Sequence, residues 1–395
     1  GYRVTRILAV IEEVQGTIPA NPVCVEMKAE NFSVDITQAD ELIKLLSDWD
    51  AGKKAYGTTS VAGSAGVILS IENAPFLIQT TVGTRLTTAN ATATPWTTAT
   101  VFAVGDIVNS ADGLHTLVCT TAGTTGAATE AAFVPNLAAN PKDDQGTKIA
   151  DGATVTWMAM PLYKQDTFAI SQFLKTFTIE VEYKTPTGEL FYQRMSNCYM
   201  GGLPMSMSGG TISAKASLSL KGTTLLESTD PTWDESLSAK TGAKVCLQEK
   251  DFYDYESFNL KIDGVVDCAE SAELSLARDA TVKDLTSGCK DVNIGTPMIS
   301  GTFNRVFSTQ ANANAANHTQ FSAVFEFIKS NGCQLILTYP NVVPELGKIT
   351  SSTEEKAYLS NTVNAHGTSA QVSVTANIIY PSHVDTTGAL ADPLA

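Results

Sequence analysis

The residue types that could carry out chemistry are few in this chain and are scattered along it. The four histidines lie at positions 115, 318, 366 and 383, and none has a second His or Cys at the spacing of a metal site. The acidic pairs Glu12/Glu13 and Asp143/Asp144 are adjacent in sequence. Adjacent residues of a strand point to opposite faces, so neither pair can share acid–base work on one substrate. We therefore expect no metal site and no catalytic carboxylate pair.

Sequence motifs of enzymes are also missing. The chain contains no GxSxG nucleophile elbow, no HExxH zinc motif, no Walker loop and no GxGxxG dinucleotide fingerprint. The stretch Gly63-Ser64-Ala65-Gly66 is followed by neither a lysine nor a helical pattern, which is typical of a turn before a strand. The sequence predicts a protein that is not an enzyme and uses no cofactor.

Seven dispersed cysteines form no CxxC pair: Cys24, Cys119, Cys198, Cys246, Cys268, Cys289 and Cys333. An odd, widely spaced set in a long chain predicts buried free thiols rather than a disulfide framework. Whether some of them pair after the cell has lysed is left open.

Composition and charge narrow the class of protein. Of 395 residues, 43% are hydrophobic and only 17% are charged, and 41 acidic residues outnumber 26 basic ones to give a net charge of −15. A grip on nucleic acid needs Lys and Arg facing phosphates, so this balance argues against one. No stretch approaches the roughly 20 apolar residues that cross a bilayer. The short apolar run near the N-terminus lacks a cleavage site, so we expect no signal peptide.

Alternating patterns dominate the sequence. Apolar residues recur at every second position in 177–183, 212–220 and 370–378, the period of strands with one buried face. Two segments have helical spacing instead, Ala74–Thr81 and His318–Ser330. The first has Asn73 as a cap, Pro75 in its first turn and Gly83 as its end. The predicted fold class is therefore mainly β.

The order of predicted elements repeats. In each half, two strands lead to a long polar loop, at 37–58 and at 278–295, and then to a strand, a helix and three strands. This order predicts two tandem β-sandwich domains, each with one flanking helix and a long loop. The first comprises 1–86 and 162–240, and the second comprises 241–395. Identity between the halves is low, so two unrelated sandwiches remain the alternative.

Residues 87–161 interrupt the first half. They are rich in Thr, Ala and Gly and contain their own short strand patterns, which predicts a small inserted all-β domain at a surface loop. The aromatic and imidazole side chains Trp96, Phe102, His115 and Trp157 are its candidate glycan contacts, because exposed rings stack on sugars. The alternative is that these rings form the core of the small domain.

Four stretches in order resemble a known family. They are Arg3–Thr17 (RVTRILAVIEEVQGT), Ser64–Leu77 (SAGVILSIENAPFL), Tyr192–Gly222 (YQRMSNCYMGGLPMSMSGGTISAKASLSLKG) and Phe258–Asn293. Together they are similar to the major tail tube proteins of siphophages, which are long-tailed bacteriophages. The match covers most of the chain outside the insert.

The insert resembles a second family. Its segments Thr100–Val108 (TVFAVGDIV), Cys119–Gly126 (CTTAGTTG) and Asp151–Trp157 (DGATVTW) are similar to a small β module common in phage tail and virion proteins. That module usually has aromatic residues where this chain has His115-Thr116-Leu117, which weakens an inherited claim of sugar binding.

The resemblance implies a mechanism and partners. Tail tube proteins form stacked rings in which the sheets of neighbouring subunits join into an inner β-barrel around DNA. Single-domain members close a ring with six copies, so a duplicated chain is expected to use three. The expected partners are further copies of the chain, the tape measure, tail terminator and distal tail proteins, DNA that passes without specific binding, and host-surface glycans for the insert. No membrane is involved, and the expected location is the virion tail, assembled in the bacterial host cytoplasm.

The resemblance also suggests contact residues. The long loops, the N-terminal arm and the segment 381–395 are expected to link rings and subunits, with these candidates: Arg3, Arg6, Glu12, Glu13, Asp40, Glu41, Lys44, Asp48, Trp49, Asp50, Lys283 and Asp284. An acidic lumen repels phosphate, and its candidates are Glu26, Glu180, Glu182 and Glu273. The alternative is that these acids are ordinary solvated surface, since the sequence does not say which strand face lines the channel.

A second function class competes with the tube. A carbohydrate-binding adhesin or decoration protein of a virion or cell surface would also be built of β-sandwiches, with the insert as its active part. The two hypotheses differ in assembly, because a tube subunit polymerises and an adhesin forms discrete particles that bind glycans.

Overall fold

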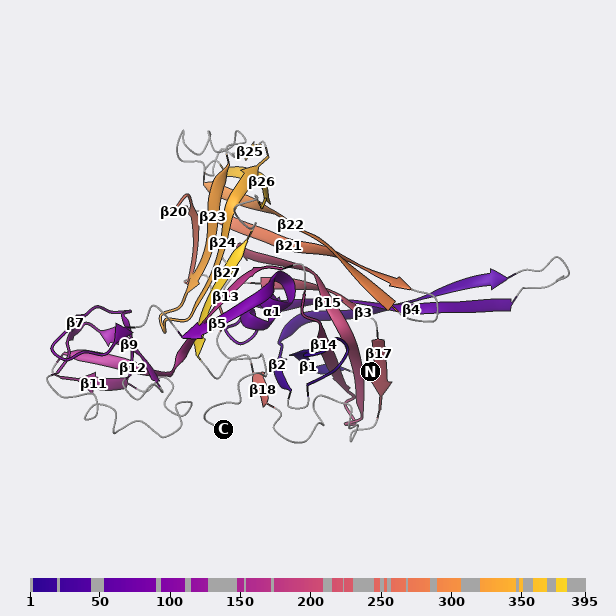
Figure 1. Ribbon diagram of the computed structural model, residues 1–395, viewed down its shortest axis with the longest axis horizontal. Helices are drawn as coiled ribbons and strands as arrows, with labels where there is room; N and C mark the ends of the chain where they lie inside the picture. The colour runs from indigo at the N-terminus through magenta and orange to yellow at the C-terminus, as the bar shows by residue number, and fades with distance from the viewer. Residues whose placement is uncertain are drawn as a thin grey trace.

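The computed structural model describes most of the chain. The described residues are 3–19, 22–43, 53–89, 94–110, 115–126, 148–152, 154–171, 174–208, 215–222, 224–229, 245–248, 252–253, 257–267, 269–284, 290–306, 320–345, 348–350, 358–367 and 374–381. They form strands, mostly antiparallel, and a single helix (Figure 1). The prediction of a mainly β fold is confirmed.

The first half of the chain builds an outer sheet in the order β18-β2-β1-β14-β15-β17. Its strands are β1 (Arg3–Ile11), β2 (Val23–Glu26), β14 (Phe177–Lys184), β15 (Leu190–Ser208), β17 (Thr224–Ser228) and β18 (Val245–Gln248). All neighbours are antiparallel except β18 and β2. The long strand β15 then leaves this sheet, because from Tyr199 onward it pairs with β16 instead of β14.

A second, inner sheet runs through both halves in the order β3-β4-β16-β15-β21-β22-β26-β25. The strands not yet placed are β3 (Ala29–Ile43), β4 (Lys53–Ile68), β16 (Lys215–Gly222), β21 (Ala269–Asp284), β22 (Lys290–Val306), β25 (Lys348–Thr350) and β26 (Tyr358–Ala365). The two halves of the chain are therefore joined edge to edge within one sheet, at β15 and β21.

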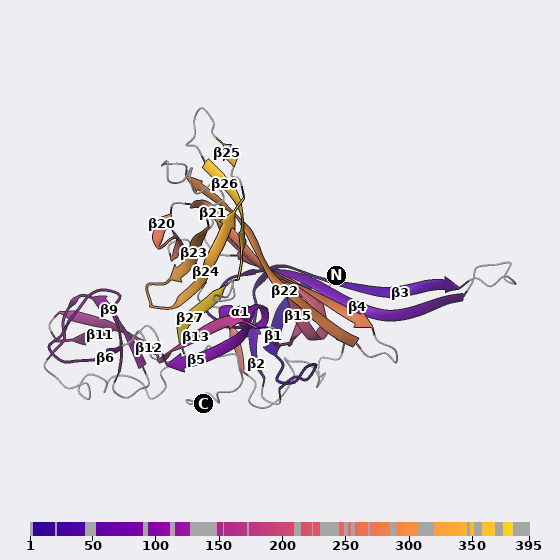
Figure 2. The same cartoon turned by 45° about the horizontal axis from the view of Figure 1, so that its top comes forward.

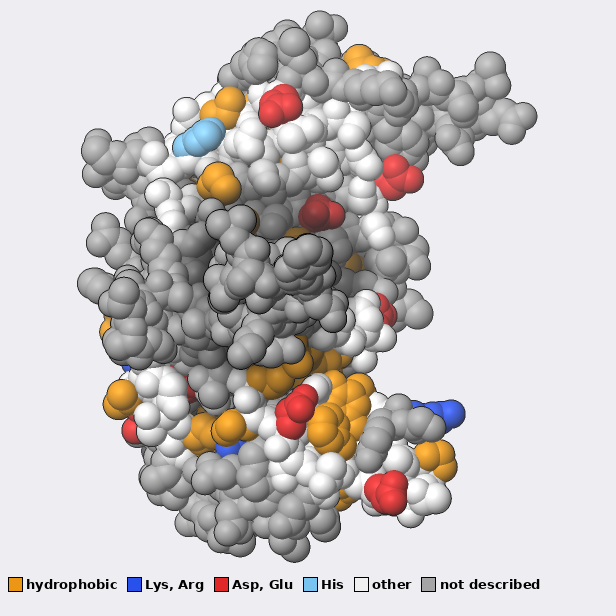
Figure 3. Space-filling view, turned by 90° about the vertical axis from the view of Figure 1, so that its right-hand side faces the viewer, with side chains coloured by type: hydrophobic (Ala, Val, Ile, Leu, Met, Phe, Trp, Pro, Cys, Tyr) orange, Lys and Arg blue, Asp and Glu red, His pale blue; other side chains and the backbone are white. Residues whose placement is uncertain are grey.

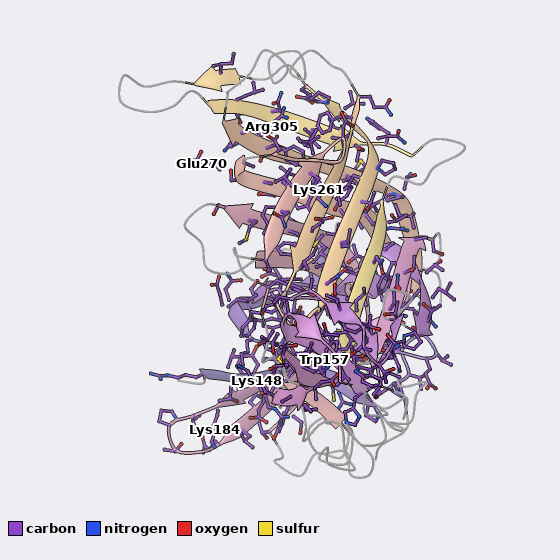
Figure 4. All side chains as sticks on the ribbon, turned by 90° about the vertical axis from the view of Figure 1, so that its left-hand side faces the viewer. Lys148, Trp157, Lys184, Lys261, Glu270 and Arg305 are labelled. Atoms are coloured by element: carbon purple, nitrogen blue, oxygen red, sulfur yellow. The ribbon has the colours of Figure 1, made fainter. Side chains whose placement is uncertain are left out.

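The second half has its own outer sheet, in the order β20-β19-β23-β24-β27-β13-β5. Its strands are β5 (Gly83–Ala89), β13 (Tyr163–Ile170), β19 (Phe258–Ile262), β20 (Val265–Asp267), β23 (Phe321–Ile328), β24 (Gln334–Pro344) and β27 (Thr375–Pro381). Figure 4 shows this sheet broadside, with Lys261 on it. Strands β5 and β13 come from the first half, so the halves share strands here too.

The two halves have the same pairing scheme. Strands β1, β2, β3, β4, β14, β15, β16 and β17 correspond in their partners to β19, β20, β21, β22, β23, β24, β26 and β27. Irregularities recur at the same points, for example at Ala29/Asn31 in β3 and at Ala269/Ser271 in β21. The same holds for Phe177/Ile179 and Phe321/Ala323. The repeat in the order of elements is thus also a repeat in register.

The helix α1 (Ala74–Val82) follows the sequence signals closely. Pro75 lies in its first turn and Gly83 ends it with a positive φ of 113°. Asn73 precedes the helix but makes no side-chain capping hydrogen bond to it, and its Oδ1 instead accepts the backbone N–H of Ser70 at 2.9 Å. All nine helix residues are buried, and the helix lies among β5, β13 and β15 at the centre of the molecule (Figure 1). The prediction of a helix at Ala74–Thr81 is confirmed.

The second predicted helix is wrong. Residues Phe321–Ile328 form strand β23, in which Phe321, Ala323, Phe325 and Phe327 are buried on alternate positions. Phe321, Val324, Phe325 and Ile328 fit a helical period, but the apolar residues of this segment also fit an alternating one. Aromatic and β-branched residues favour a strand, and β23 pairs with β19 on one side and with β24 on the other.

The two long polar loops are also corrected. The described parts of 37–58 and 278–295 continue β3, β4, β21 and β22, which form two hairpins that project from the body toward the same side (Figures 1 and 2). The sequence of these segments lacks the alternation of apolar and polar residues that signals a strand, which is why the strands were not predicted.

The expected N-terminal arm is likewise part of the fold. Strand β1 is paired on one side with β14 and on the other with β2. Its residues from Ile7 to Ile11 are buried. Arg3–Ile11 is therefore a strand of the outer sheet and is not an extended arm.

The insert lies in the chain between β5 and β13, two strands that pair with each other. Ala89 at the end of β5 lies opposite Lys164 in β13, so the ends of the insert are adjacent. Its short strands make a five-stranded sheet, β11-β12-β9-β8-β6, and the pair β10-β7. They are β6 (Thr94–Pro95), β7 (Val101–Phe102), β8 (Ile107–Asn109), β9 (His115–Thr121), β10 (Gly123–Thr124), β11 (Lys148–Asp151) and β12 (Val155–Pro161).

Candidate assembly surface

The inner sheet has one face in the core and one face outside it. On β21, Ala272, Leu274 and Leu276 are buried, whereas Glu273 between them is exposed. The same alternation on β22 and β26 turns Ser300, Thr302 and Thr362 outward. The outward face of this sheet is therefore made largely of small hydroxyl and amide side chains: Asn31, Ser33, Ser64, Ser206, Ser208, Ser271, Ser275, Ser300, Thr302, Asn304, Ser360, Thr362 and Asn364.

The charge on these strands has one sign. Among their described side chains, the exposed charged ones are all acidic, namely Glu30, Asp35, Glu270 and Glu273. Figure 3 looks at the side from which the hairpins project; among its coloured side chains, Asp and Glu are scattered, Lys and Arg appear at a few points, and hydrophobic side chains gather in the lower part. Side chains without positive charge release no counterions from DNA, so the exposed side chains that the structure describes on these strands hold phosphates weakly.

The predicted lumen acids fall into three environments. Glu273 is exposed on the inner sheet, and its position in a lumen stays a prediction. Glu26 and Glu182 lie at half-buried positions of the outer sheet, where Arg6 pairs with Glu26 at 3.0 Å and Thr5 donates to Glu182 at 2.8 Å.

The prediction for Glu180 is wrong. Its side chain is 1% exposed, and Arg194 Nη2 lies 2.8 Å from its Oε2. Both faces of β14 are covered at this point, because Phe177 to Val181 are all buried. The Glu180 carboxylate is a structural ion-pair partner and cannot face a channel.

Glu12, a candidate contact residue, is buried as well. It is 1% exposed and accepts hydrogen bonds from Thr176 Oγ1 at 2.6 Å and Thr178 Oγ1 at 2.7 Å. It also accepts from the backbone N–H groups of Gly16 at 2.7 Å and Asn197 at 2.8 Å. This carboxylate therefore ties the turn after β1 to β14 and β15, which removes it as a contact between subunits. Sequence reasoning missed this role because the partners are distant in the chain.

The other contact candidates divide by position. Arg3 and Glu13 are exposed at either end of β1 and its turn, and Arg6 is the half-buried partner of Glu26. Asp40 and Glu41 lie on the projecting part of β3, and Lys283 and Asp284 on that of β21. Lys44, Asp48, Trp49 and Asp50 fall outside the described residues, as do 382–395 of the expected C-terminal link.

The candidate glycan contacts of the insert form its core instead. Trp157 is fully buried, Trp96 is 8% exposed and Phe102 is 9% exposed, and His115 is 1% exposed. The Phe102 and Trp157 rings meet edge to face with centroids 5.1 Å apart. The prediction of a glycan surface on these residues is wrong, because a module this small needs its rings for packing.

Asp151 organises that core, although sequence reasoning did not single it out. Its Oδ2 accepts the indole N–H of Trp96 at 2.9 Å and that of Trp157 at 3.0 Å. Its Oδ1 accepts the backbone N–H of Gly126 at 2.9 Å. The sequence signal that could have indicated this role is Asp151-Gly152, which stands just before the strand that contains Val155-Thr156-Trp157. Figure 4 labels Trp157 in the insert.

The described interior contains a small void and buried thiols. A void of about 10 Å³ in the core is lined by apolar side chains such as Leu69, Met205 and Phe325. Cys119 and Cys198 are buried free thiols, and burial raises the pKa of both thiols, most strongly for Cys198. Over the described part of the chain, no three His, Cys, Asp or Glu side chains gather where a metal could be held.

Comparisons with known proteins add no relative. The chain matches no protein-family model, and a search of the curated proteins finds no match. In the part of the chain that the structure describes, no helix is long and apolar enough to cross a membrane. The class that fold and surface define is a mainly β protein with a repeated pairing scheme and a polar, acid-bearing face on its inner sheet.

Proposed function

We propose that this chain is the major tail tube subunit of a long-tailed bacteriophage and that it is not an enzyme. Copies join into stacked rings, three to a ring with pseudo-six-fold symmetry, around a channel through which DNA leaves the virion. The partners are further copies of the chain and the tape measure, tail terminator and distal tail proteins. The site of action is the virion tail, assembled in the host cytoplasm.

One observation carries the proposal: the two halves already join edge to edge in one continuous sheet, through β15 and β21. A sheet that has joined two equivalent units in this way can go on joining units until it closes, and closure removes its open edges. The outward face of that sheet suits a channel wall, because its hydroxyls and acids do not retain phosphate.

The paired hairpins support the stacking of rings. Strands β3–β4 and β21–β22 project from the body toward one side, one hairpin from each half (Figure 2). In a stack, hairpins on one side of a ring can reach the ring beyond it. The adhesin alternative loses its main support, because the aromatic and imidazole side chains of the insert that were expected to contact sugars are buried.

Negative-stain electron microscopy of the purified chain tests the proposal. The expected result is rings or tubes with a central hole wider than duplex DNA, roughly 20 Å across. Discrete particles without a central hole, even in a concentrated sample, would contradict the proposal. A glycan array with the same sample tests the adhesin hypothesis separately.

A further inference from the structure

The junction inside the chain is a template for a junction between copies. In it, residues 202–208 of β15 pair antiparallel with residues 271–277 of β21. Met205 lies opposite Leu274, and the two side chains are 6% and 1% exposed. The joint thus combines a backbone ladder with an apolar pair facing the core.

The repeated register identifies the equivalent edges. Cys198, opposite Phe177, corresponds to Val342, opposite Phe321. Seven residues further along, Met205 corresponds to Ile349 in β25. Asn31 and Ser271 correspond at the shared bulge, and three residues further Leu274 corresponds to Val34 in β3.

Both equivalent edges are open within the described chain. There β3 pairs only with β4, and β25 pairs only with β26. Ile349 is 53% exposed, whereas its counterpart Met205 is 6% exposed. The two edges belong to different ends of the inner sheet, with β25 at the top of Figure 1 and β3 running to the right, so they do not meet within one copy.

We propose that β25 of one copy adds antiparallel to β3 of a second copy, with Ile349 opposite Val34. The template register then places Lys348 opposite Asp35 and Thr350 opposite Ser33, so that an opposite-charge pair adjoins the apolar pair. Each copy carries one edge of each kind, so the contact is head-to-tail and closes when the rotation allows it. This inference rests on the proposed function and gives it a residue-level contact.

Disulfide trapping tests the register. The double variant Ile349→Cys/Val34→Cys is assembled, oxidised and run on a non-reducing gel. The expected result is a ladder of covalent oligomers that ends at three copies. The matched control is Ile349→Cys/Ile36→Cys, which moves one thiol two residues along the same face of β3. Such diagonal neighbours lie about 7–8 Å apart, beyond the usual reach of a disulfide.

The outcomes separate this inference from the proposed function. A ladder with Val34→Cys and none with Ile36→Cys supports the register. Tubes in the microscope without that ladder, or with the ladder only in the control, overturn the register and leave the tube intact. Particles that form neither rings nor a ladder overturn both.

A pair of charge-reversal variants tests the same register if the cysteine variants do not assemble. Lys348→Asp and Asp35→Lys are each expected to reduce the assembled fraction measured by sedimentation, and the double variant is expected to restore it. Circular dichroism of the monomers checks that each variant is folded. Equal loss in the single and double variants would overturn the proposed register.

Discussion

The buried pair Glu180–Arg194 shows how much depends on a single carboxylate. Both side chains are 1% exposed, and the Nε and Nη2 atoms of Arg194 lie 3.1 and 2.8 Å from Glu180 Oε2. Removing one partner of a buried ion pair leaves the other charge desolvated, which typically costs about 3–5 kcal/mol. The first outer sheet is therefore held by this pair as well as by its apolar core.

Glu180→Gln is expected to lower the free energy of unfolding by about 3 kcal/mol, because Arg194 keeps its charge and loses its anionic partner. Urea unfolding followed by circular dichroism measures the change. Glu182→Gln is the matched control, two residues along β14 and half-buried, and should change stability by less than about 0.5 kcal/mol. Equal stability of both variants would mean that Glu180 is solvated, as a lumen acid would be.

At the scale of elements, the β21–β22 hairpin depends on a close approach of two backbones. A Cβ added at Gly301 in β22 would clash with the carbonyl oxygen of Glu273 in β21. Gly63 occupies the corresponding position of β4 in the first half. A glycine is thus required where the long hairpin crosses the body of the sheet.

Gly301→Ala is expected to destabilise the chain by about 1–3 kcal/mol, the usual cost of forcing a group into a packed site. Thermal unfolding measures it. Gly202→Ala is the matched control, since its nearest neighbour, Leu276 O, lies 3.9 Å from the added Cβ. If both variants melt together, the contact of Gly301 with Glu273 does not constrain the hairpin.

The elements also show what the sequence could predict. The helix α1 was predictable because its signals are local, with Asn73, Pro75 and Gly83 in the right places. Strand β23 was not, because its aromatic residues fit two periods and only its neighbours β19 and β24 decide between them. The projecting hairpins were not predicted because their sequence lacks the alternation of apolar and polar residues that signals a strand.

The candidate surface divides in the same way. Glu273 was predictable as an exposed acid because β21 has one buried and one open face. Glu180 lies in an equally regular alternation, but both faces of β14 are covered. Arg194 and β1, which come from other parts of the chain, lie against β14, so its sequence alone does not show that it is covered. Periodicity tells which residues share a face and does not tell whether that face is open.

At the scale of the whole molecule, both chain connections of the insert lie at one place, and beside them Val118 and Met160 pack with the core of the body. It leaves and returns between β5 and β13, which pair with Ala89 opposite Lys164. It has a core of its own around Trp96 and Trp157. Ile107, at its base, approaches Gly332 of the body. Its sheets share no strand pairing with the inner sheet.

Replacing residues 90–162 by Asn-Gly should therefore leave assembly intact, because Asn, Gly and Tyr163 then form a three-residue loop that closes the β5–β13 ladder between Ala89 and Lys164. Electron microscopy is expected to show tubes with the same hole and a smaller outer diameter. The control is the full chain assembled in parallel at the same concentration. Failure of the folded deletion variant to form rings would instead give the insert a part in joining subunits, and the edge contact of β25 with β3 would then not suffice for assembly.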